Sequence, residues 1–229
     1  MHNSLQFVDD INRQLICFGD KTIGEIALDL DINLMAGKGA SSNVLRKIIH
    51  KITMDRPFGG IDKRQSLKII PVDSNTTKCF ESLSFRAIEI KQVLNSDFVN
   101  SSVMDEIQKQ VYLPIYKKER HEHYHKCHLG KAFRLVFDGD LYRTINEDFM
   151  LYQSFFQNLE RVYSVDGFDR MKTYWVNNFP RTPETTILHM RPHARNKIDF
   201  DTSMEGYQIT KHSFWLNRDF INALLKSMK

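Results

Sequence analysis

Cysteine is scarce in this sequence, and long hydrophobic runs are missing. Three cysteines occur in 229 residues, far apart, and they form no C-x-x-C pair. An odd number of separated cysteines argues against a disulfide framework and fits reduced thiols in a cytoplasm. No apolar run reaches the roughly 18 residues that a membrane-spanning helix needs, and the first residues do not resemble a signal peptide. We therefore expect a cytoplasmic protein that is neither secreted nor inserted into a membrane.

Internal repeats and low-complexity linkers are also absent, and neither sign of charge dominates. Hydrophobic residues make up 41% and charged residues 26% of the chain, as in an ordinary globular protein. The net charge of +4 is compatible with a polyanionic partner, although many enzymes have a similar charge. The length allows one large domain or two small ones with an adequate core.

Hydrophobic periodicity predicts helices first, then strands, then further helices. Thr22 and Glu25 have capping-box spacing and open a helix over 22–30, and a second helix has its apolar face over 44–52. Strands are predicted over 66–72, 83–90, 185–191 and 207–216, with a hairpin around Asp138–Gly139. A long helix is predicted over 149–163, and Asn217 is the predicted cap of a final helix. This order indicates an α/β (mixed α+β) fold in a single domain over 1–229.

Two neighbouring predicted strands carry the most obvious nuclease pattern. PVD (71–73) is followed, after fifteen residues, by EIK (89–91). Phosphodiester cleavage uses two carboxylates that hold a divalent cation and a lysine near the attacking water, so Asp73, Glu89 and Lys91 are candidates. If the strand continues through 91, Glu89 and Lys91 share its inward face. In the simpler interpretation, which we prefer, Asp73 opens a turn and the other two form a surface pair.

The segment KKERHEHYHKCHLGK (117–131) is rich in histidine and basic residues. His121, His123, His125 and Cys127 alternate, so a strand here would align them on one face. A zinc site needs about four converging ligands, which one straight strand does not provide. We therefore predict no metal site, and leave a phosphate-contacting segment and a solvated loop as alternatives.

The end of the strand over 185–191 carries side chains suited to DNA. Arg191, His193, Arg195 and Lys197 alternate, so their donors would project together. Arginine binds a guanine edge bidentately in the major groove, while histidine and lysine bind phosphate or base acceptors. The alternative is an ordinary polar exit from a strand, and DNA contact is the better explanation.

Two adjacent aromatic residues lie in the last predicted strand. Alternation allows only one of Phe214 and Trp215 to face the core. The other would lie against nucleic acid, beside Lys211 and Arg218.

Several of these stretches, in the same order, resemble the MutH family of GATC-recognising endonucleases. The resemblance is closest to the C-terminal, non-catalytic lobe of the two-lobed staphylococcal type II restriction enzyme. It is carried by DKTIGEIALDL (20–30), GKG (37–39), LKIIPVDS (67–74), ILHMRPHARN (187–196) and ITKHSFWLNRDFINALL (209–225). It implies a restriction-endonuclease-like core, with a central mixed sheet flanked by helices and two sub-lobes that grip DNA. Residues 95–130 and 160–185 match the family poorly.

The catalytic motif of the family is incomplete here. Active members carry Asp, six residues and then Glu-x-Lys; Lys68 matches the lysine, but Ser66 stands at the Glu position and Gly59 at the Asp position. Arg46 replaces a further glutamate of the family. Asp55 and Asp62 lie nearby, and a small gap would restore one carboxylate but not the pair. Mg²⁺ needs anionic oxygens, whereas an arginine beside Lys68 suits a DNA phosphate, so the resemblance implies a phosphate clamp.

The sequence therefore predicts a catalytically silent, GATC-type double-stranded DNA-binding domain without a cofactor. Its expected DNA-binding residues are those of the clamp and of the late strands: Arg46, Lys68, Arg191, His193, Arg195, Lys211 and Trp215. It would act as an allosteric lobe beside a catalytic nuclease lobe or subunit, as the C-terminal domain of a longer enzyme or as a separate chain. One alternative is an active Mg²⁺-dependent endonuclease using Asp73, Glu89 and Lys91. Another is a partner-binding subunit without DNA affinity.

Overall fold

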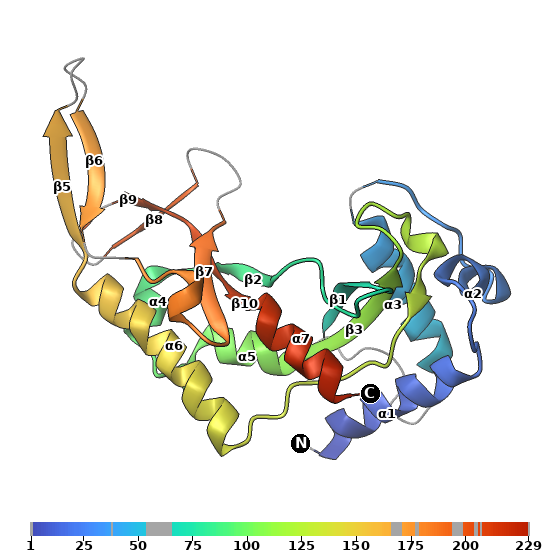
Figure 1. Cartoon of the computed structure of the whole chain (residues 1–229). Coiled ribbons are helices and arrows are strands. Elements are labelled where there is room, and N and C mark those ends of the chain that lie inside the picture. Colours follow the sequence, from blue (N-terminus) through green and yellow to red (C-terminus); the bar gives the residue numbers. More distant parts are fainter. Residues whose placement is uncertain are drawn as a thin grey trace. The chain divides into compact units, whose positions relative to one another are not determined.

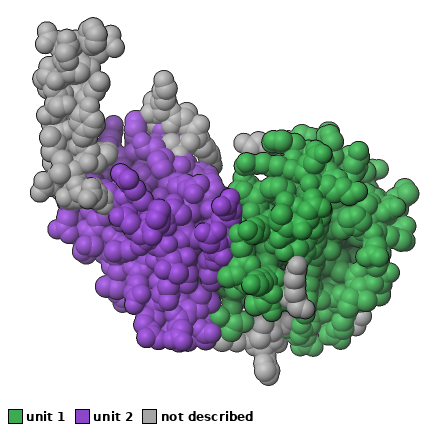
Figure 2. All heavy atoms as spheres, in the orientation of Figure 1, with its two compact units in different colours: residues 1–81, 108–136, 221–229 green, residues 82–107, 137–220 purple. Residues whose placement is uncertain are grey.

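A computed structural model describes residues 2–37, 39–53, 66–165, 171–176, 179–193, 199–203, 206 and 208–228. The chain divides into two compact units, each built from separate stretches of sequence. Unit 1 contains residues 1–81, 108–136 and 221–229, and unit 2 contains residues 82–107 and 137–220. Figure 1 labels most of the elements, and Figure 2 colours unit 1 green and unit 2 purple.

Unit 1 combines three N-terminal helices with a small mixed sheet. The helices are α1 (His2–Ile16), α2 (Ile23–Asp29) and α3 (Ala40–Thr53). Strand β1 (Ser66–Asp73) pairs in parallel with β3 (Gln110–Lys117), and β3 pairs antiparallel with β4 (His128–Leu129). A short 3-10 helix, η2 (Tyr124–Lys126), precedes β4, and most of α7 (Arg218–Ser227) also belongs to this unit.

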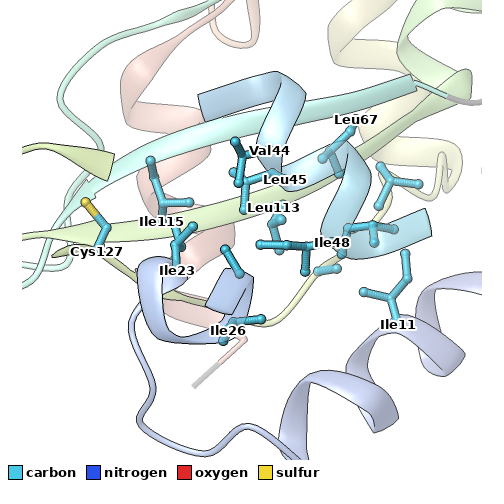
Figure 3. Close-up of a cluster of buried hydrophobic side chains, with 14 of the residues drawn as sticks. Ile11, Ile23, Ile26, Val44, Leu45, Ile48, Leu67, Leu113, Ile115 and Cys127 are labelled. Carbon is cyan, nitrogen blue, oxygen red and sulfur yellow. The ribbon is translucent and has the colours of Figure 1, made fainter. Parts of the chain in front are cut away.

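The core of unit 1 lies between its helices and one face of the sheet (Figure 3). Helix α3 buries Val44, Leu45, Ile48 and Ile49, the stripe predicted from its periodicity. Strand β1 contributes Leu67 to this cluster, together with side chains from β3 and Cys127. Because strand residues alternate, the odd-numbered residues of β1 face α3 and the even-numbered ones face away.

Unit 2 contains an antiparallel sheet, two hairpins and several helices. The sheet has the order β2 (Leu83–Ile88), β10 (His212–Leu216) and β7 (Leu188–Pro192). The hairpins pair β5 (Glu160–Val165) with β6 (Met171–Val176), and β8 (Phe200–Thr202) with β9 (Gln208–Thr210). The helical elements are α4 (Ile90–Leu94), η1 (Phe98–Asn100), α6 (Gly139–Gln157), η3 (Thr182–Glu184) and most of α5 (Ser102–Lys109).

The hairpin predicted around Asp138–Gly139 is wrong, because these residues begin the long helix α6. The Asp138 carboxylate accepts a hydrogen bond from the Leu141 N–H at 2.8 Å, which is an N-cap and not a turn. The helix is correctly predicted in kind, but it runs over Gly139–Gln157, and residues 162–163 belong to β5. Asp-Gly favours a hairpin only where the flanking segments can pair as strands. Here the residues that follow have apolar side chains at helical spacing, so they form a helix.

The mixed α+β class predicted from sequence is confirmed, with its strands distributed differently. The described residues form two three-stranded sheets and two hairpins in place of one central sheet. Within the described part of the chain, no helix has the length and apolar character required to cross a membrane.

Candidate nucleic-acid interface

The pairing of β7 with β10 decides which side chains share a face. Across the two antiparallel strands, Phe214 lies opposite Met190, Trp215 opposite His189, and Ser213 opposite Arg191. Directly opposed residues project to the same side of an antiparallel sheet. The first pair therefore occupies one face, and the other two pairs occupy the opposite face.

The face with Phe214 is packed against α6 within unit 2. Phe214 is fully buried, and its ring lies 5.6 Å from the rings of both Phe149 and Tyr152. The sequence expectation that only one of the two adjacent aromatics would enter the core is thus confirmed. Trp215 is half-buried on the other face.

Two basic side chains lie against the indole of Trp215, and a serine holds one of them in place. The guanidinium carbon of Arg191 lies 5.3 Å from the centre of the indole ring, in a cation–π contact. The ring of His193 lies 5.9 Å from it at an interplanar angle of 45°, and the Oγ of Ser213 is hydrogen-bonded to Nδ1 of His193 at 2.9 Å. Arg191 and His193 are both exposed, so the cluster presents donors to solvent.

A buried polar network lies behind this cluster. His189 is 1% exposed, stacks on Trp215 at 6.3 Å, and its Nδ1 donates to Oδ1 of Asn217. Asn217 in turn donates through Nδ2 to the Thr185 carbonyl at 3.0 Å. Helix α7 begins directly after Asn217, as predicted, but the side chain of this residue serves the network. Burial lowers the pKa of His189, and the charge of Arg191 acts in the same direction.

Two buried atoms of this network make no hydrogen bond within the described residues: Nε2 of His189 and Nε1 of Trp215. Each buried atom without a partner costs about 1–3 kcal/mol, so such atoms are rare where a surface serves only to fold the chain. Nδ1 of His212, on the other face of the same sheet, is also buried without a partner among the described residues, so it is the contact with Arg191 that sets the Trp215 face apart.

The carboxylate of Asp148 fixes the start of β7. This residue lies on α6, is 4% exposed, and accepts hydrogen bonds from the N–H groups of Thr186, Ile187 and Leu188 at 2.9, 2.6 and 2.8 Å. Burial raises the pKa of Asp148, while the three N–H donors act against that rise. Charge-assisted hydrogen bonds to Asp148 therefore fix the first residues of β7, the strand that carries Arg191.

Lys211 has a partner within the protein. Its Nζ lies 2.7 Å from Oδ1 of Asp199, with the lysine side chain 37% exposed and the aspartate side chain 19% exposed. Its carbonyl also accepts the His193 N–H at 2.7 Å, which ties it to the cluster around Trp215. A phosphate contact by Lys211 would compete with Asp199. Arg195 and Lys197 lie outside the described residues.

The predicted phosphate clamp of Arg46 and Lys68 is not assembled in unit 1. Lys68 is half-buried in β1, in the even-numbered row that faces away from α3. Arg46 is exposed on α3, which covers the opposite, Leu67-bearing face. The sheet therefore lies between the two cations. Gly59, Asp55 and Asp62 lie outside the described residues.

The residues of the active-nuclease alternative, Asp73, Glu89 and Lys91, do not lie together on one strand face. The Asp73 carboxylate accepts the Asn75 and Thr76 N–H groups at 2.8 and 3.3 Å, which lowers its pKa and confirms its turn-opening role. The strand interpretation for Glu89 and Lys91 is wrong: β2 ends at Ile88, Glu89 is the N-cap residue of α4, and Lys91 lies on that helix. The Asp201 carboxylate, which accepts the Ile90 N–H at 2.5 Å, supports this helix start.

Between the end of β3 and β4, the histidine-rich segment forms a turn and a 3-10 helix, so the strand considered for residues 121–127 is not formed. His123 and His125 still stack on each other, but Cys127 is buried in the core, so the four side chains do not share one face. Among the described residues, no three His, Cys, Asp or Glu side chains converge as metal ligands would. Burial raises the pKa of Cys127 to about 11, as expected for a packed thiol.

Sequence reasoning missed the roles of His189, Ser213, Asp148 and Asp199, and it predicted only a helix cap for Asn217. His189 is two residues from Arg191, and Ser213 is two residues from Trp215. Alternation along each strand therefore places them on the same faces as those residues, and the sequence alone indicates this. The contacts of Asp148 and Asn217 span 28 to 40 residues of sequence, and local patterns do not report them.

A search against protein-family models finds no match to this chain, and a search of curated proteins finds none either. The resemblance to the MutH family therefore stays a prediction from the sequence motifs.

Proposed function

We propose that this chain is a GATC-type double-stranded DNA-binding domain with a restriction-endonuclease-like, MutH-like core. In this proposal it is catalytically silent and acts in the cytoplasm as the effector lobe of a nuclease lobe or subunit. The single observation that carries the proposal is the exposed Arg191 guanidinium on the indole of Trp215, beside His193. The family assignment itself is carried by the sequence resemblance.

The chemistry of this cluster suits a guanine edge. A guanidinium donates two parallel hydrogen bonds to O6 and N7 of guanine, and each GATC strand contains one guanine. An arginine already oriented on an aromatic face loses less side-chain entropy on binding than a free one. His193 and Lys211 would then contact neighbouring acceptors, with Lys211 leaving Asp199.

The positions of the candidate catalytic carboxylates, Asp73 and Glu89, support a catalytically silent domain in preference to an active nuclease. Asp73 uses its carboxylate to hold its own turn, and it differs from Lys68 by an odd number of residues, so the two face opposite sides of β1. Glu89 is the N-cap residue of α4 and Lys91 lies in its first turn, so the two do not share the strand face that the alternative assumed. The exposed Arg46 remains available to phosphate.

The proposal is tested with fluorescence anisotropy on the full chain, using labelled duplexes that contain GATC or a scrambled sequence. Wild type should prefer GATC, and Arg191→Ala should remove about 1–3 kcal/mol of that preference. Arg143→Ala, which removes an exposed arginine from α6 of the same unit, is the control and should leave the preference unchanged. Equal affinity for both duplexes would refute specific recognition.

A second measurement addresses catalytic silence directly. Supercoiled plasmid incubated with the purified chain and Mg²⁺ or Mn²⁺ should stay intact. Nicking that disappears in Glu89→Ala would instead establish the active-nuclease alternative.

A further inference from the structure

The segment 117–131, here called the basic segment, concentrates charge on unit 1. It contains five lysines and arginines against two glutamates, a net charge of +3, whereas the whole chain carries +4. It also holds four of the nine histidines. The proposed recognition cluster in unit 2 uses none of these residues, so their concentration calls for a separate explanation.

The backbone of the basic segment is held in place by unit 1. The carbonyl of Cys127 accepts the Ile23 N–H at 2.8 Å, and the thiol of Cys127 lies in the core (Figure 3). The hydroxyl of Tyr124 donates to the Met35 carbonyl at 2.8 Å and accepts the Met35 N–H at 3.1 Å. Gly24 brings α2 so close that a Cβ there would lie 2.8 Å from the His125 carbonyl oxygen. A ligand would therefore meet a preformed surface and lose little free energy to ordering it.

The positive charges of the basic segment, in contrast, are only weakly neutralised by acidic side chains nearby. Lys118 and Lys126 are exposed and make no ion pair with any described residue. Arg120 lies 3.6 Å from Glu81, with both side chains more than half exposed, and such pairs contribute little. Glu122 directs its carboxylate to the Lys118 backbone N–H. One of the two acids of the segment is thus used internally.

Imidazole rings lie among these cations. The rings of His123 and His125 stack at 5.5 Å with an interplanar angle of 19°, and that of Tyr124 meets His125 edge-on at 5.9 Å. Cations interleaved with aromatic rings are typical of nucleic-acid-binding surfaces, where donors contact phosphate and flat rings lie along sugar or base. An acidic protein partner would need the cations but not the rings.

We infer that the basic segment is a second, sequence-independent nucleic-acid contact that binds backbone phosphates. The inference rests on the proposed function for its choice of DNA as the polyanion. It assigns affinity to unit 1 and leaves sequence discrimination to the cluster around Arg191 in unit 2. Each phosphate that a cation neutralises releases counterions, so removing a phosphate-binding side chain should flatten the dependence of affinity on salt.

The test uses the full chain and a labelled scrambled duplex in a KCl series. Lys118→Ala combined with Lys126→Ala should weaken binding about tenfold at low salt and reduce the logarithmic salt slope by about 1.8, from ~0.9 per neutralised phosphate. Replacing both lysines by arginine should restore binding. The control, Lys51→Ala with Lys226→Ala, removes equal charge from α3 and α7 and should change the slope little.

A slope equal to that of the control variant would overturn the inference. So would stronger binding of poly-glutamate than of DNA at equal charge, because the surface would then be a protein-docking site. His123→Ala with His125→Ala should weaken scrambled DNA binding about threefold, and unchanged binding would also count against the inference.

Failure of this inference is distinguishable from failure of the proposed function. The proposed function fails if GATC and scrambled duplexes bind equally, whatever the basic segment does. The inference fails if the basic-segment variants retain wild-type affinity for scrambled DNA, even where the preference for GATC persists.

Discussion

At the scale of single residues, the indole of Trp215 contacts Arg191, His193 and His189. Its face orients the guanidinium, and its Nε1 is buried without a partner among the described residues. These two properties are separable by substitution, because phenylalanine keeps an aromatic face and removes the buried donor.

Trp215→Phe should therefore keep most of the preference for GATC, within about threefold of wild type, since cation–π contacts are weaker on phenylalanine than on tryptophan. Trp215→Ala should reduce the preference about tenfold, because the aromatic face that orients Arg191 is then removed. The ratio of dissociation constants for GATC and scrambled duplexes measures both effects. Equal ratios for the two variants would show that Arg191 does not depend on the ring.

Asp148 gives a second residue-scale prediction, on stability. Its carboxylate serves three backbone N–H groups that a substitution would leave buried. Asp148→Ala should lower the free energy of unfolding by about 3 kcal/mol, and Asp148→Asn by less, because an amide oxygen still accepts a hydrogen bond. Urea unfolding followed by circular dichroism measures this. Asp140→Ala, at an exposed position of the same helix, is the control and should change stability little.

At the scale of elements, the seven-residue helix α2 is shaped by two effects. Its capping box depends on neighbouring residues in the sequence, and its glycine depends on packing against a distant segment. Its capping box was predicted from Thr22 and Glu25, and both hydrogen bonds of the box are present. The reason for glycine at position 24 is tertiary, because the His125 carbonyl occupies the space of a side chain.

Gly24→Ala should therefore destabilise unit 1, although alanine normally favours a helix over glycine by about 1 kcal/mol. The substitution also should weaken scrambled-duplex binding, since it displaces the basic segment. Gly139→Ala in α6 is the matched control, because no atom lies within 4 Å of its would-be Cβ. Thermal unfolding of the two variants should shift in opposite directions or leave Gly139→Ala unchanged. A stabilised Gly24→Ala protein would contradict the close packing of α2 on η2.

At the scale of the whole molecule, stability should depend on pH through two histidines of unit 2, the buried His189 and the half-buried His212. Burial lowers the pKa of both His189 and His212 in the folded state. In the unfolded chain both return to about 6.5. The unfolded state therefore binds more protons below that pH, and stability present at pH 7 should be lost as the pH falls toward 5.

His212→Phe isolates this effect, because the ring still packs near Phe156 and Phe179 while its titration is removed. The number of protons taken up on unfolding between pH 7 and 5 should fall, measured by urea unfolding at several pH values. Asp148, whose raised pKa acts with the opposite sign, is present in both proteins and cancels in the difference. Identical pH dependence in the two proteins would show that His212 does not contribute.

The sequence by itself determined the features that depend on local pattern. The capping box of α2, the apolar stripe of α3, and the placement of Phe214 and Trp215 on opposite faces all follow from the short periods of helix and strand, whereas the structure decides that Phe214 is the inward one. The common face of Arg191 and His193 follows from the same alternation.

The tertiary structure decided what depends on partners distant in sequence. It pairs Lys211 with Asp199 and places Asp148 under β7. It also puts the sheet between Arg46 and Lys68 and turns Asp138–Gly139 from a predicted hairpin into a helix start. A buried polar group needs a hydrogen-bond partner, and that partner is often distant in sequence. A dipeptide such as Asp-Gly is compatible with both a turn and a helix start, and packing of the flanking residues selects one of them.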